Sequence, residues 1–162
     1  MKEPEADYFG FIFFIILVIA LNTLLTMKTI CYISNFGKNL DSKTIDTLTK
    51  KVSLKNNKLG VTGLLIIKDN HFFQIIEGES HIIDELFDKI SIDKRHNNLI
   101  KLLETQIEDR IFDDYNLGDY QIVKDYSNLK KLYLYFNWIK EAEYIPAIEI
   151  INLTTNFLKF SH

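Results

Sequence analysis

Cysteine and arginine are scarce in this sequence. Its 162 residues contain one cysteine, Cys31, so no disulfide can form within the chain. The two arginines, Arg95 and Arg110, lie late in the chain, whereas an acyl-phosphate hydrolase on a small α+β fold needs an early arginine in a phosphate-holding loop. The formal net charge of −3 argues against a nucleic-acid binder, which usually presents a basic face.

Motifs for catalysis are missing as well. The sequence has no glycine-rich phosphate loop and no serine nucleophile elbow. Its four histidines show no spacing typical of metal ligands. No internal repeat, low-complexity tract or long linker divides the chain. We therefore expect neither an enzyme nor a metal site, and one compact domain with a short extension.

The N-terminal segment is strongly apolar. Residues 9–21 contain no charged side chain, and the low-charge stretch continues to residue 26. Because a membrane-spanning helix needs roughly 17–25 mostly apolar residues, the first interpretation of residues 9–26 is an inner-membrane anchor. Lys28 and Lys38 then favour a cytoplasmic location for the rest of the chain. Two other interpretations are that translation begins at Met27, or that the segment is a buried core helix.

Downstream of Met27 the apolar residues follow the pattern of a mixed α+β domain. A period of two predicts a strand at residues 29–34, and the almost wholly apolar segment 61–67 predicts a second, central strand. Further strands are expected at 71–77 and 99–108, with a short fifth strand near 116–123. Spacings of three and four predict a helix capped by Asp41 or Ser42 and another capped by Ser80. Residues 68–70 are expected to form a hairpin turn, and Gly78 to end the third strand.

This order, β-α-β-β-α-β with an extra strand, predicts a ferredoxin-like sandwich. Right-handed crossovers place the first two helices on one face of the sheet. Two further amphipathic segments, 125–138 and 144–160, are therefore expected to cover the other face. We divide the chain into a hydrophobic N-terminal segment (1–26), a central domain (27–123) and a C-terminal helical cap (124–162).

Four short pieces of the central domain carry the functional signal. Tyr32 lies on the first predicted strand, and Asn56 opens the segment Asn-Asn-Lys-Leu-Gly-Val-Thr-Gly before the second. Gln74 lies in Phe-Phe-Gln-Ile-Ile-Glu-Gly on the third strand. Asp93-Lys94-Arg95-His96 follows the second helix. In this order and spacing they resemble the motifs of the BLUF family of blue-light sensors, over residues 27–117.

The resemblance implies a blue-light photoreceptor that binds a flavin, usually FAD, without covalent attachment. Tyr32 would give an electron and a proton to the photoexcited flavin, Gln74 would bridge Tyr32 and the ring, and Asn56 would hydrogen-bond the ring. These residue types suit the chemistry, because a phenol can release an electron and then its proton. A primary amide carries both an acceptor and a donor group, so its rotation or tautomerisation reverses the hydrogen bonds.

Four further positions are expected to hold the ribityl-phosphate end of the flavin by the same resemblance. They are Lys89, Asp93, Arg95 and His96. Many relatives carry arginine in place of Lys89, and lysine keeps the charge but loses bidentate phosphate geometry. A surface position after the helix remains the alternative for Arg95 and His96.

Two departures from the family concern the signal output. Relatives often carry Trp-x-Met on the fifth strand near the glutamine, and the aligned residues here are Tyr115 and Leu117. Tyr115 replaces the tryptophan, and Leu117 lacks the thioether that relays the signal. The second departure is Lys55, which precedes Asn56 where relatives often carry Asn. We expect the photochemistry to survive these changes, while signal relay through Tyr115 and Leu117 is in doubt.

Several alternatives remain open. The chain could be a light-insensitive flavin-binding or protein-interaction module of the same fold, or an RNA-binding sheet with exposed Phe72 and Phe73. With no effector domain, a photoreceptor of this type must act on an unknown protein effector or change its own assembly, and relatives of this short type often form homo-oligomers. Residues 129–160 are the expected surface for either. A bacterial origin is expected, and FAD and FMN are not distinguished.

Overall fold

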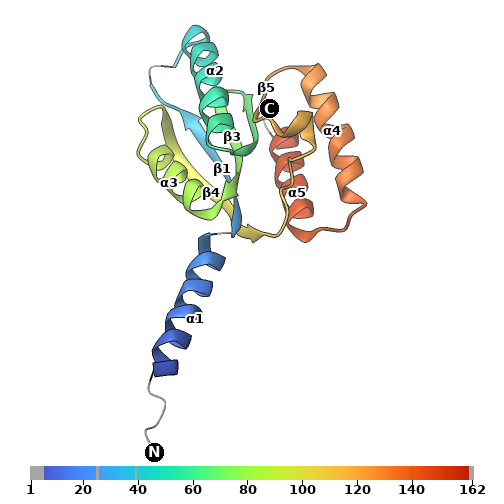
Figure 1. Cartoon of the computed structure of the whole chain (residues 1–162). Helices are drawn as coiled ribbons and strands as arrows, with labels where there is room; N and C mark the ends of the chain where they lie inside the picture. The colour runs from blue at the N-terminus through green and yellow to red at the C-terminus, as the bar shows by residue number, and fades with distance from the viewer. Residues whose placement is uncertain (1–5, 25, 39, 161–162) are drawn as a thin grey trace, which may run out of the picture.

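A five-stranded sheet with helices on both faces forms the body of the molecule (Figure 1). The computed structural model describes residues 6–24, 26–38 and 40–160. The strands lie in the order β4-β1-β3-β2-β5. They span Met27–Phe36 (β1), Thr62–Lys68 (β2), His71–Glu79 (β3), His96–Ile107 (β4) and Gln121–Val123 (β5). Strand β5 runs parallel to β2 and the other neighbours are antiparallel, which confirms the predicted ferredoxin-like α+β fold.

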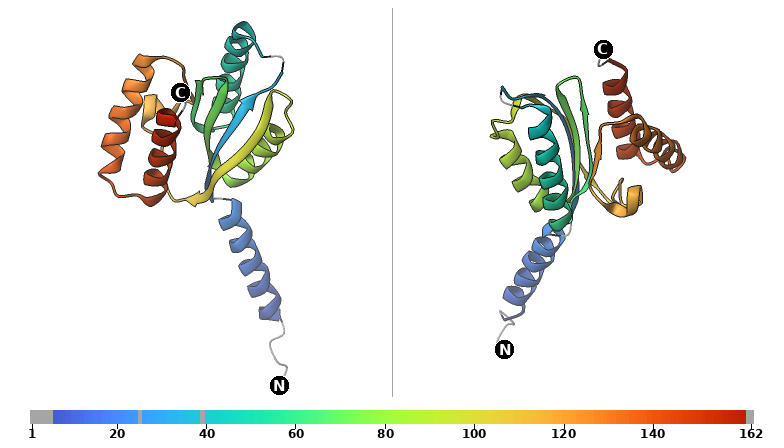
Figure 2. Two further views of the ribbon diagram at one scale, coloured as in Figure 1. Left: turned by 180° about the vertical axis from the view of Figure 1, so that it is seen from behind. Right: turned by 90° about the horizontal axis from the view of Figure 1, so that it is seen from above.

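The helices form two layers around this sheet. Helices α2 (Ser42–Lys58) and α3 (Ser80–Ser91) lie on one face, and α4 (Tyr126–Lys140) and α5 (Ile145–Phe160) lie on the other (Figure 2). A short 3-10 helix, η1 (Tyr115–Gly118), precedes β5. The prediction that the first two helices share a face and the C-terminal helices cover the opposite one is confirmed.

The sheet divides the core into two clusters because successive side chains on a strand point to opposite faces. On β3, Phe72 and Ile76 pack with the α2/α3 cluster, whereas Phe73 and Ile75 pack with the α4/α5 cluster. Both phenylalanines are fully buried, so the exposed aromatic surface that RNA binding requires is absent at Phe72 and Phe73.

Local signals in the sequence explain several boundaries. The Asp41 side chain accepts a hydrogen bond from the Thr44 backbone N–H at 2.7 Å and caps α2, as predicted. Between β2 and β3, Asp69 and Asn70 have φ values of 50° and 63°. Two successive positive φ values define the type I′ turn that suits the twist of a two-residue hairpin. The predicted hairpin is confirmed.

Other boundaries differ from the predictions. Strand β1 extends beyond residues 29–34 at both ends, β4 begins at His96, and β3 continues through Gly78 to Glu79. The Ser80 hydroxyl does not cap α3; it donates to the Thr26 backbone carbonyl at 2.8 Å. The predicted fifth strand near 116–123 shrinks to β5 because Asn116 and Leu117 have φ values of 51° and 64°, which are incompatible with a strand.

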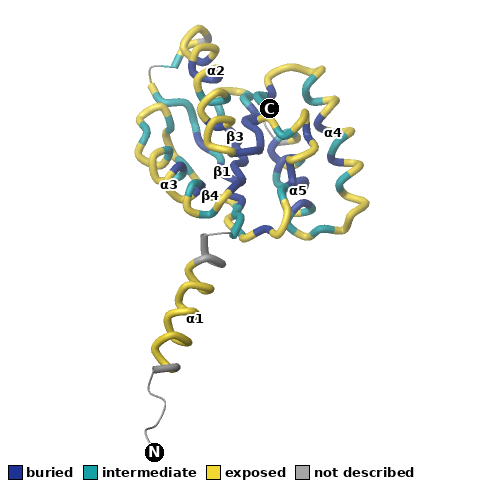
Figure 3. Tube along the Cα trace, viewed as in Figure 1, coloured by how far each residue is buried: buried dark blue, intermediate teal, exposed yellow. Residues whose placement is uncertain are grey.

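The N-terminal helix α1 (Ala6–Leu24) extends away from the body (Figures 1 and 3). Its apolar side chains are exposed, for example Phe9 at 84% and Phe13 at 67%, so the interpretation as a buried core helix is wrong. Within the described residues, no helix is long and apolar enough to cross a membrane. The predicted anchor over residues 9–26 is therefore not supported.

Candidate functional site

The centre of the site is a pair of side chains on neighbouring strands. Tyr32 on β1 and Gln74 on β3 are directly opposed in the antiparallel register, and both point to the α2/α3 face. The Tyr32 hydroxyl donates a hydrogen bond to Gln74 Oε1. Tyr32 is inaccessible to solvent and Gln74 is 4% exposed. Opposed residues on antiparallel strands lie close enough for such a contact, so the register of β1 and β3 places the phenol against the amide.

Burial controls the protonation of Tyr32. Removal from solvent raises the pKa of its hydroxyl well above the ordinary value, because the phenolate would lose its hydration. The ring packs edge-on against Phe87 and His96, with centroid distances of 5.7 Å and 5.9 Å. Tyr32 is therefore a neutral phenol whose proton lies in a defined hydrogen bond to Gln74.

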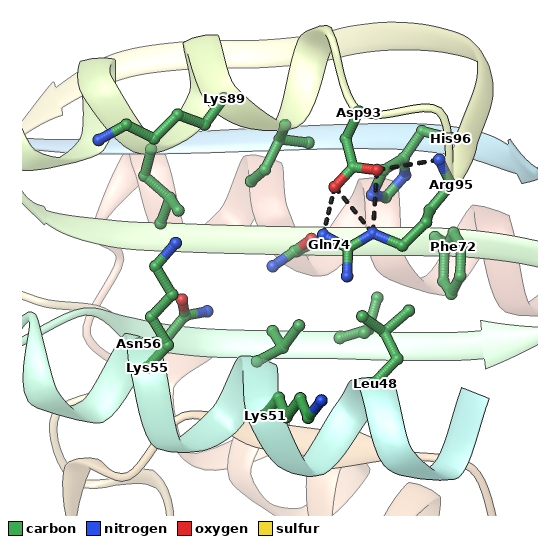
Figure 4. A pocket seen from close by; sticks show the side chains of 14 residues that line it. Leu48, Lys51, Lys55, Asn56, Phe72, Gln74, Lys89, Asp93, Arg95 and His96 are labelled. Carbon is green, nitrogen blue, oxygen red and sulfur yellow. Dashed lines mark hydrogen bonds and ion pairs between the residues drawn. The ribbon is translucent and has the colours of Figure 1, made fainter. Parts of the chain in front are cut away.

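A pocket opens beside this pair, between α2 and α3 (Figure 4). Apolar side chains and Gln74 form its walls, and Asn56 lines it from the end of α2. Asn56 is 2% exposed, and its Nδ2 atom has no hydrogen-bond partner among the described residues. A buried amide without a partner costs about 1–3 kcal/mol, so this donor calls for a ligand acceptor in the pocket.

The Asp93–Arg95–His96 segment forms one end of the pocket. The Arg95 side chain extends over the pocket, and its Nε atom lies 2.8 Å from Asp93 Oδ2 (Figure 4). This hydrogen bond lowers the pKa of Asp93. His96 Nδ1 shares a hydrogen bond with the Ser34 hydroxyl at 2.7 Å, and burial lowers the pKa of the His96 ring. Arg95 and His96 thus both line the pocket, and Arg95 does so from an exposed position.

Lysines surround the pocket on its two helices. Lys89 lines it from α3, and Lys51 and Lys55 line it from α2. Lys89 is largely exposed and pairs with Glu85 at 3.3 Å. Sequence reasoning missed Lys51, although it lies within one turn of the apolar Leu48 that faces the pocket. It noted Lys55 only as a departure from the family and not as a lining residue.

The two residues expected to relay the signal do not line the pocket. Tyr115 is buried in the α4/α5 cluster, with its ring 5.0 Å from that of Tyr135. Leu117 is 96% exposed on η1. The structure therefore separates Tyr115 and Leu117 from Gln74, which lies on the other side of the sheet.

Sequence reasoning missed a second tyrosine at the site. Tyr120 is 1% exposed and belongs to the α2/α3 cluster, and its hydroxyl accepts a hydrogen bond from Gln74 Nε2. The available signal was alternation: Val123 faces α4/α5, so Ile122 and Tyr120 fall on the face that carries Tyr32.

Comparison with known protein families identifies the class of protein to which this domain belongs. The family described as "BLUF: Sensors of blue-light using FAD" matches residues 27–118, which is more than half of the chain. The chain therefore belongs to the BLUF family. The match covers Tyr32, Asn56, Gln74 and the Asp93–His96 segment.

Individual relatives agree with the family assignment. The chain is 36% identical over 75 residues to the photoactivated adenylate cyclase subunit beta of Euglena longa, covering 46% of this chain and 9% of that protein. It is 30% identical over 77 residues to the blue light- and temperature-regulated antirepressor BluF of Escherichia coli (strain K12), covering 48% of this chain and 19% of the relative. Since these organisms differ so widely, a bacterial origin stays a prediction.

Solved structures show the same fold. The dark-state structure of BlrB, a BLUF protein, superposes with a TM-score of 0.56 at 30% identity, covering 62% of this chain and 74% of BlrB. The photo-activated state of BlsA gives a TM-score of 0.55 at 26% identity, covering 67% and 76%. The chain spans only a small part of the cyclase subunits, so their enzymatic activity is not transferred to it.

The residues of the pocket fit a flavin. The unpaired Asn56 amide supplies a donor for a ring carbonyl, and Gln74 supplies a donor and an acceptor. Apolar walls suit a planar ring, and the lysines and Arg95 suit an anionic phosphate at the rim. The predicted site residues Tyr32, Asn56 and Gln74 are thus brought together in one place.

Proposed function

We propose that this chain is a blue-light photoreceptor that binds FAD non-covalently and uses Tyr32 and Gln74 as its switch. The observation that carries the proposal is the buried Tyr32–Gln74 hydrogen bond beside the unpaired Asn56 amide. Both features lie on the α2/α3 face, at one pocket, within the region that matches the family.

The proposed switch is a change of hydrogen bonding at Gln74. When bound, the flavin supplies light absorption and an excited state that accepts an electron. Tyr32, a buried neutral phenol, would donate the electron and release its proton toward Gln74 Oε1. After the electron and a proton return to Tyr32, the Gln74 amide would face it with the donor and acceptor ends exchanged. Asn56 holds the ring in place throughout.

The choice of FAD over FMN rests on the family description and on basic residues at the pocket rim. A second hollow adjoins the pocket at Arg95 and His96, and Lys38 and Lys94 line it. These positive charges suit the second phosphate of FAD, which FMN lacks. Heat release of the cofactor followed by chromatography against both flavins tests this choice.

For the output we propose a protein effector or a homo-oligomer that binds the C-terminal helices. Leu134 and Trp138 on α4 are 63% and 57% exposed, and Tyr126 is 83% exposed. Phe136 and Ile150, by contrast, are buried against the sheet. The exposed side chains of α4 are therefore free for a partner, while the remainder of residues 129–160 covers the core.

Absorption spectroscopy of the full chain before and after blue light tests the proposal. We expect a flavin spectrum with a small red shift that reverses in the dark. A bound flavin without any shift supports the alternative of a light-insensitive module, which the exposed position of Leu117 favours. A protein that stays colourless after addition of FAD contradicts both.

A further inference from the structure

The amide of Gln74 lies between two buried phenols. Its Oε1 atom accepts a hydrogen bond from Tyr32, and its Nε2 atom donates one to the hydroxyl of Tyr120. Both tyrosines are at least 99% buried, since Tyr32 is 0% exposed and Tyr120 is 1% exposed. Both hydroxyls are therefore removed from bulk solvent, and each is a hydrogen-bond partner of the amide.

Backbone hydrogen bonds hold Tyr120 in place. Its N–H donates to Asn57 Oδ1 at 2.8 Å, and its carbonyl accepts from the Ser53 hydroxyl at 3.0 Å. Both partners lie on α2, which also carries Asn56 and lines the pocket. The Tyr120 backbone is thus tied to α2, and its ring is buried in the α2/α3 cluster.

We propose that Tyr120 is the positioning residue that fixes the orientation of the Gln74 amide and couples that orientation to β5. A phenol hydroxyl accepts from an amide N–H and donates to an amide oxygen, so Tyr120 can bond either end of Gln74. An exchange of the two ends turns Tyr120 from acceptor to donor. Phenylalanine can do neither. The coupling of the Gln74 orientation to β5 rests on the proposed photoreceptor function. The positioning of the Gln74 amide by Tyr120 does not.

The position of Tyr120 in the chain connects Gln74 to the C-terminal helices through β5. It directly precedes β5, which pairs with β2 and leads within three residues to α4. Tyr115 and Leu117, which align with the relay residues of the family, do not line the pocket that Gln74 lines. Of these three residues, Tyr120 alone is hydrogen-bonded to Gln74.

Nuclear magnetic resonance of the flavin-loaded full chain in the dark tests the positioning. In Tyr120→Phe the Gln74 side-chain amide protons should shift upfield as their acceptor is lost. The matched control is Tyr135→Phe, which removes the hydroxyl that donates to the Ile111 carbonyl at 2.6 Å on the opposite face of the sheet. Gln74 resonances that respond equally to both variants, or to neither, would overturn the proposal.

A second dark measurement needs no variant. Nuclear Overhauser contacts between the Gln74 amide protons and the Tyr120 ring should appear in the wild-type protein, and their absence counts against the proposal even where Tyr120→Phe fails to fold. The same samples can be loaded with FAD or left without flavin, since the Tyr120 bond is expected in both.

Hydrogen exchange under blue light tests the coupling. We expect light to change exchange at residues 121–130 in the wild type and in Tyr135→Phe, and this response to be lost in Tyr120→Phe although the flavin shift remains. A retained response would overturn the coupling. If no variant shows a flavin shift, the photoreceptor function fails, while the dark resonance data still decide whether Tyr120 positions Gln74.

Discussion

The two faces of the sheet use the same strands for different purposes. The α4/α5 face is closed by apolar packing, such as the stacked rings of Phe73 and Phe157 with centroids 4.9 Å apart. The α2/α3 face carries Tyr32, Gln74 and Tyr120 on the sheet and leaves a pocket under its helices. Alternate residues of one strand therefore serve a packed core and a polar site.

The difference indicates how a small domain maintains an incompletely filled face. Open space beside buried polar groups is unfavourable, because lining atoms lose packing contacts and donors lose partners. The closed face must offset that cost. We therefore expect substitutions on the α4/α5 face to change mainly stability, and those on the α2/α3 face to change mainly flavin binding and light response.

The largest expected effect is at the switch. Tyr32→Phe should abolish the light-induced red shift completely, because it removes the proton and the hydroxyl that contact Gln74. Flavin binding should persist, since the ring that packs against Phe87 remains. Difference absorption spectroscopy measures this directly. The matched Tyr135→Phe variant lies on the closed face and should keep the full shift; a shift that survives in Tyr32→Phe would contradict the assigned switch.

Adjacent leucines on β2 separate stability from binding. Leu64 is fully buried in the α4/α5 cluster, whereas Leu65 is 4% exposed and lines the pocket. Leucine-to-alanine changes in cores cost about 2–5 kcal/mol, with the larger values where a closed cavity is left. We expect Leu64→Ala near the upper end and Leu65→Ala near the lower end, measured by urea unfolding of the flavin-free protein.

Flavin titration should give the reverse order for the same two variants. Leu65→Ala should weaken binding because it removes part of the pocket wall, and Leu64→Ala should bind flavin as the wild type does wherever it is folded. Equal losses of affinity in both would show that the two faces are not independent.

The sequence predicted the two faces more reliably than the details of the site. The apolar run of β2 and the turn residues after it are local signals, so the strands and the hairpin turn were identified from the sequence. The polar pair Tyr32 and Gln74 was identified from the family motifs. The structure at the end of the domain, around η1 and β5, was not predicted correctly. Left-handed φ values at Asn116 and Leu117 depend on how η1 packs, and they end the fifth strand that was predicted near 116–123 before it reaches these residues.

That break also explains the missed tyrosine. Alignment to the family pointed to Tyr115 and Leu117, but the turn at η1 directs them away from Gln74. Tyr120 lies five positions beyond Tyr115, where no family motif marks it, and only the tertiary structure brings its hydroxyl to the amide. Long-range contacts of this kind are not encoded in local spacing.

An intermediate effect is expected at Asn56. Its buried Nδ2 has no partner among the described residues, so Asn56→Leu should raise the stability of the flavin-free protein by about 1 kcal/mol. The same change should weaken flavin binding roughly tenfold, the equivalent of one hydrogen bond of about 1.4 kcal/mol. Thermal unfolding and flavin titration measure the two effects. Asn137→Leu, at an exposed position of α4, is the control and should leave flavin affinity unchanged.

The smallest expected effect concerns Glu77, the buried carboxylate of the closed face. It accepts hydrogen bonds from the Ile111 and Phe112 backbone N–H groups at 3.0 Å and 2.7 Å and from Thr62. Desolvation nevertheless raises its pKa. The folded state therefore holds this proton to higher pH than the unfolded state does. The contribution is fully present below the unfolded pKa of about 4.3 and is lost as pH rises through the folded pKa.

Glu77→Gln removes this titration. The free energy of unfolding of the wild type minus that of the variant should therefore fall as pH rises above about 4. The fall should be about 1.4 kcal/mol for each unit that separates the folded and unfolded pKa values of Glu77. Urea unfolding between pH 2 and 8 measures it. Glu104→Gln is the control of opposite sign. Hydrogen bonds from Lys101 and Lys28 lower the pKa of Glu104 to about 2, so its contribution is lost as pH falls. Matching pH profiles for the two variants would contradict the raised pKa at Glu77.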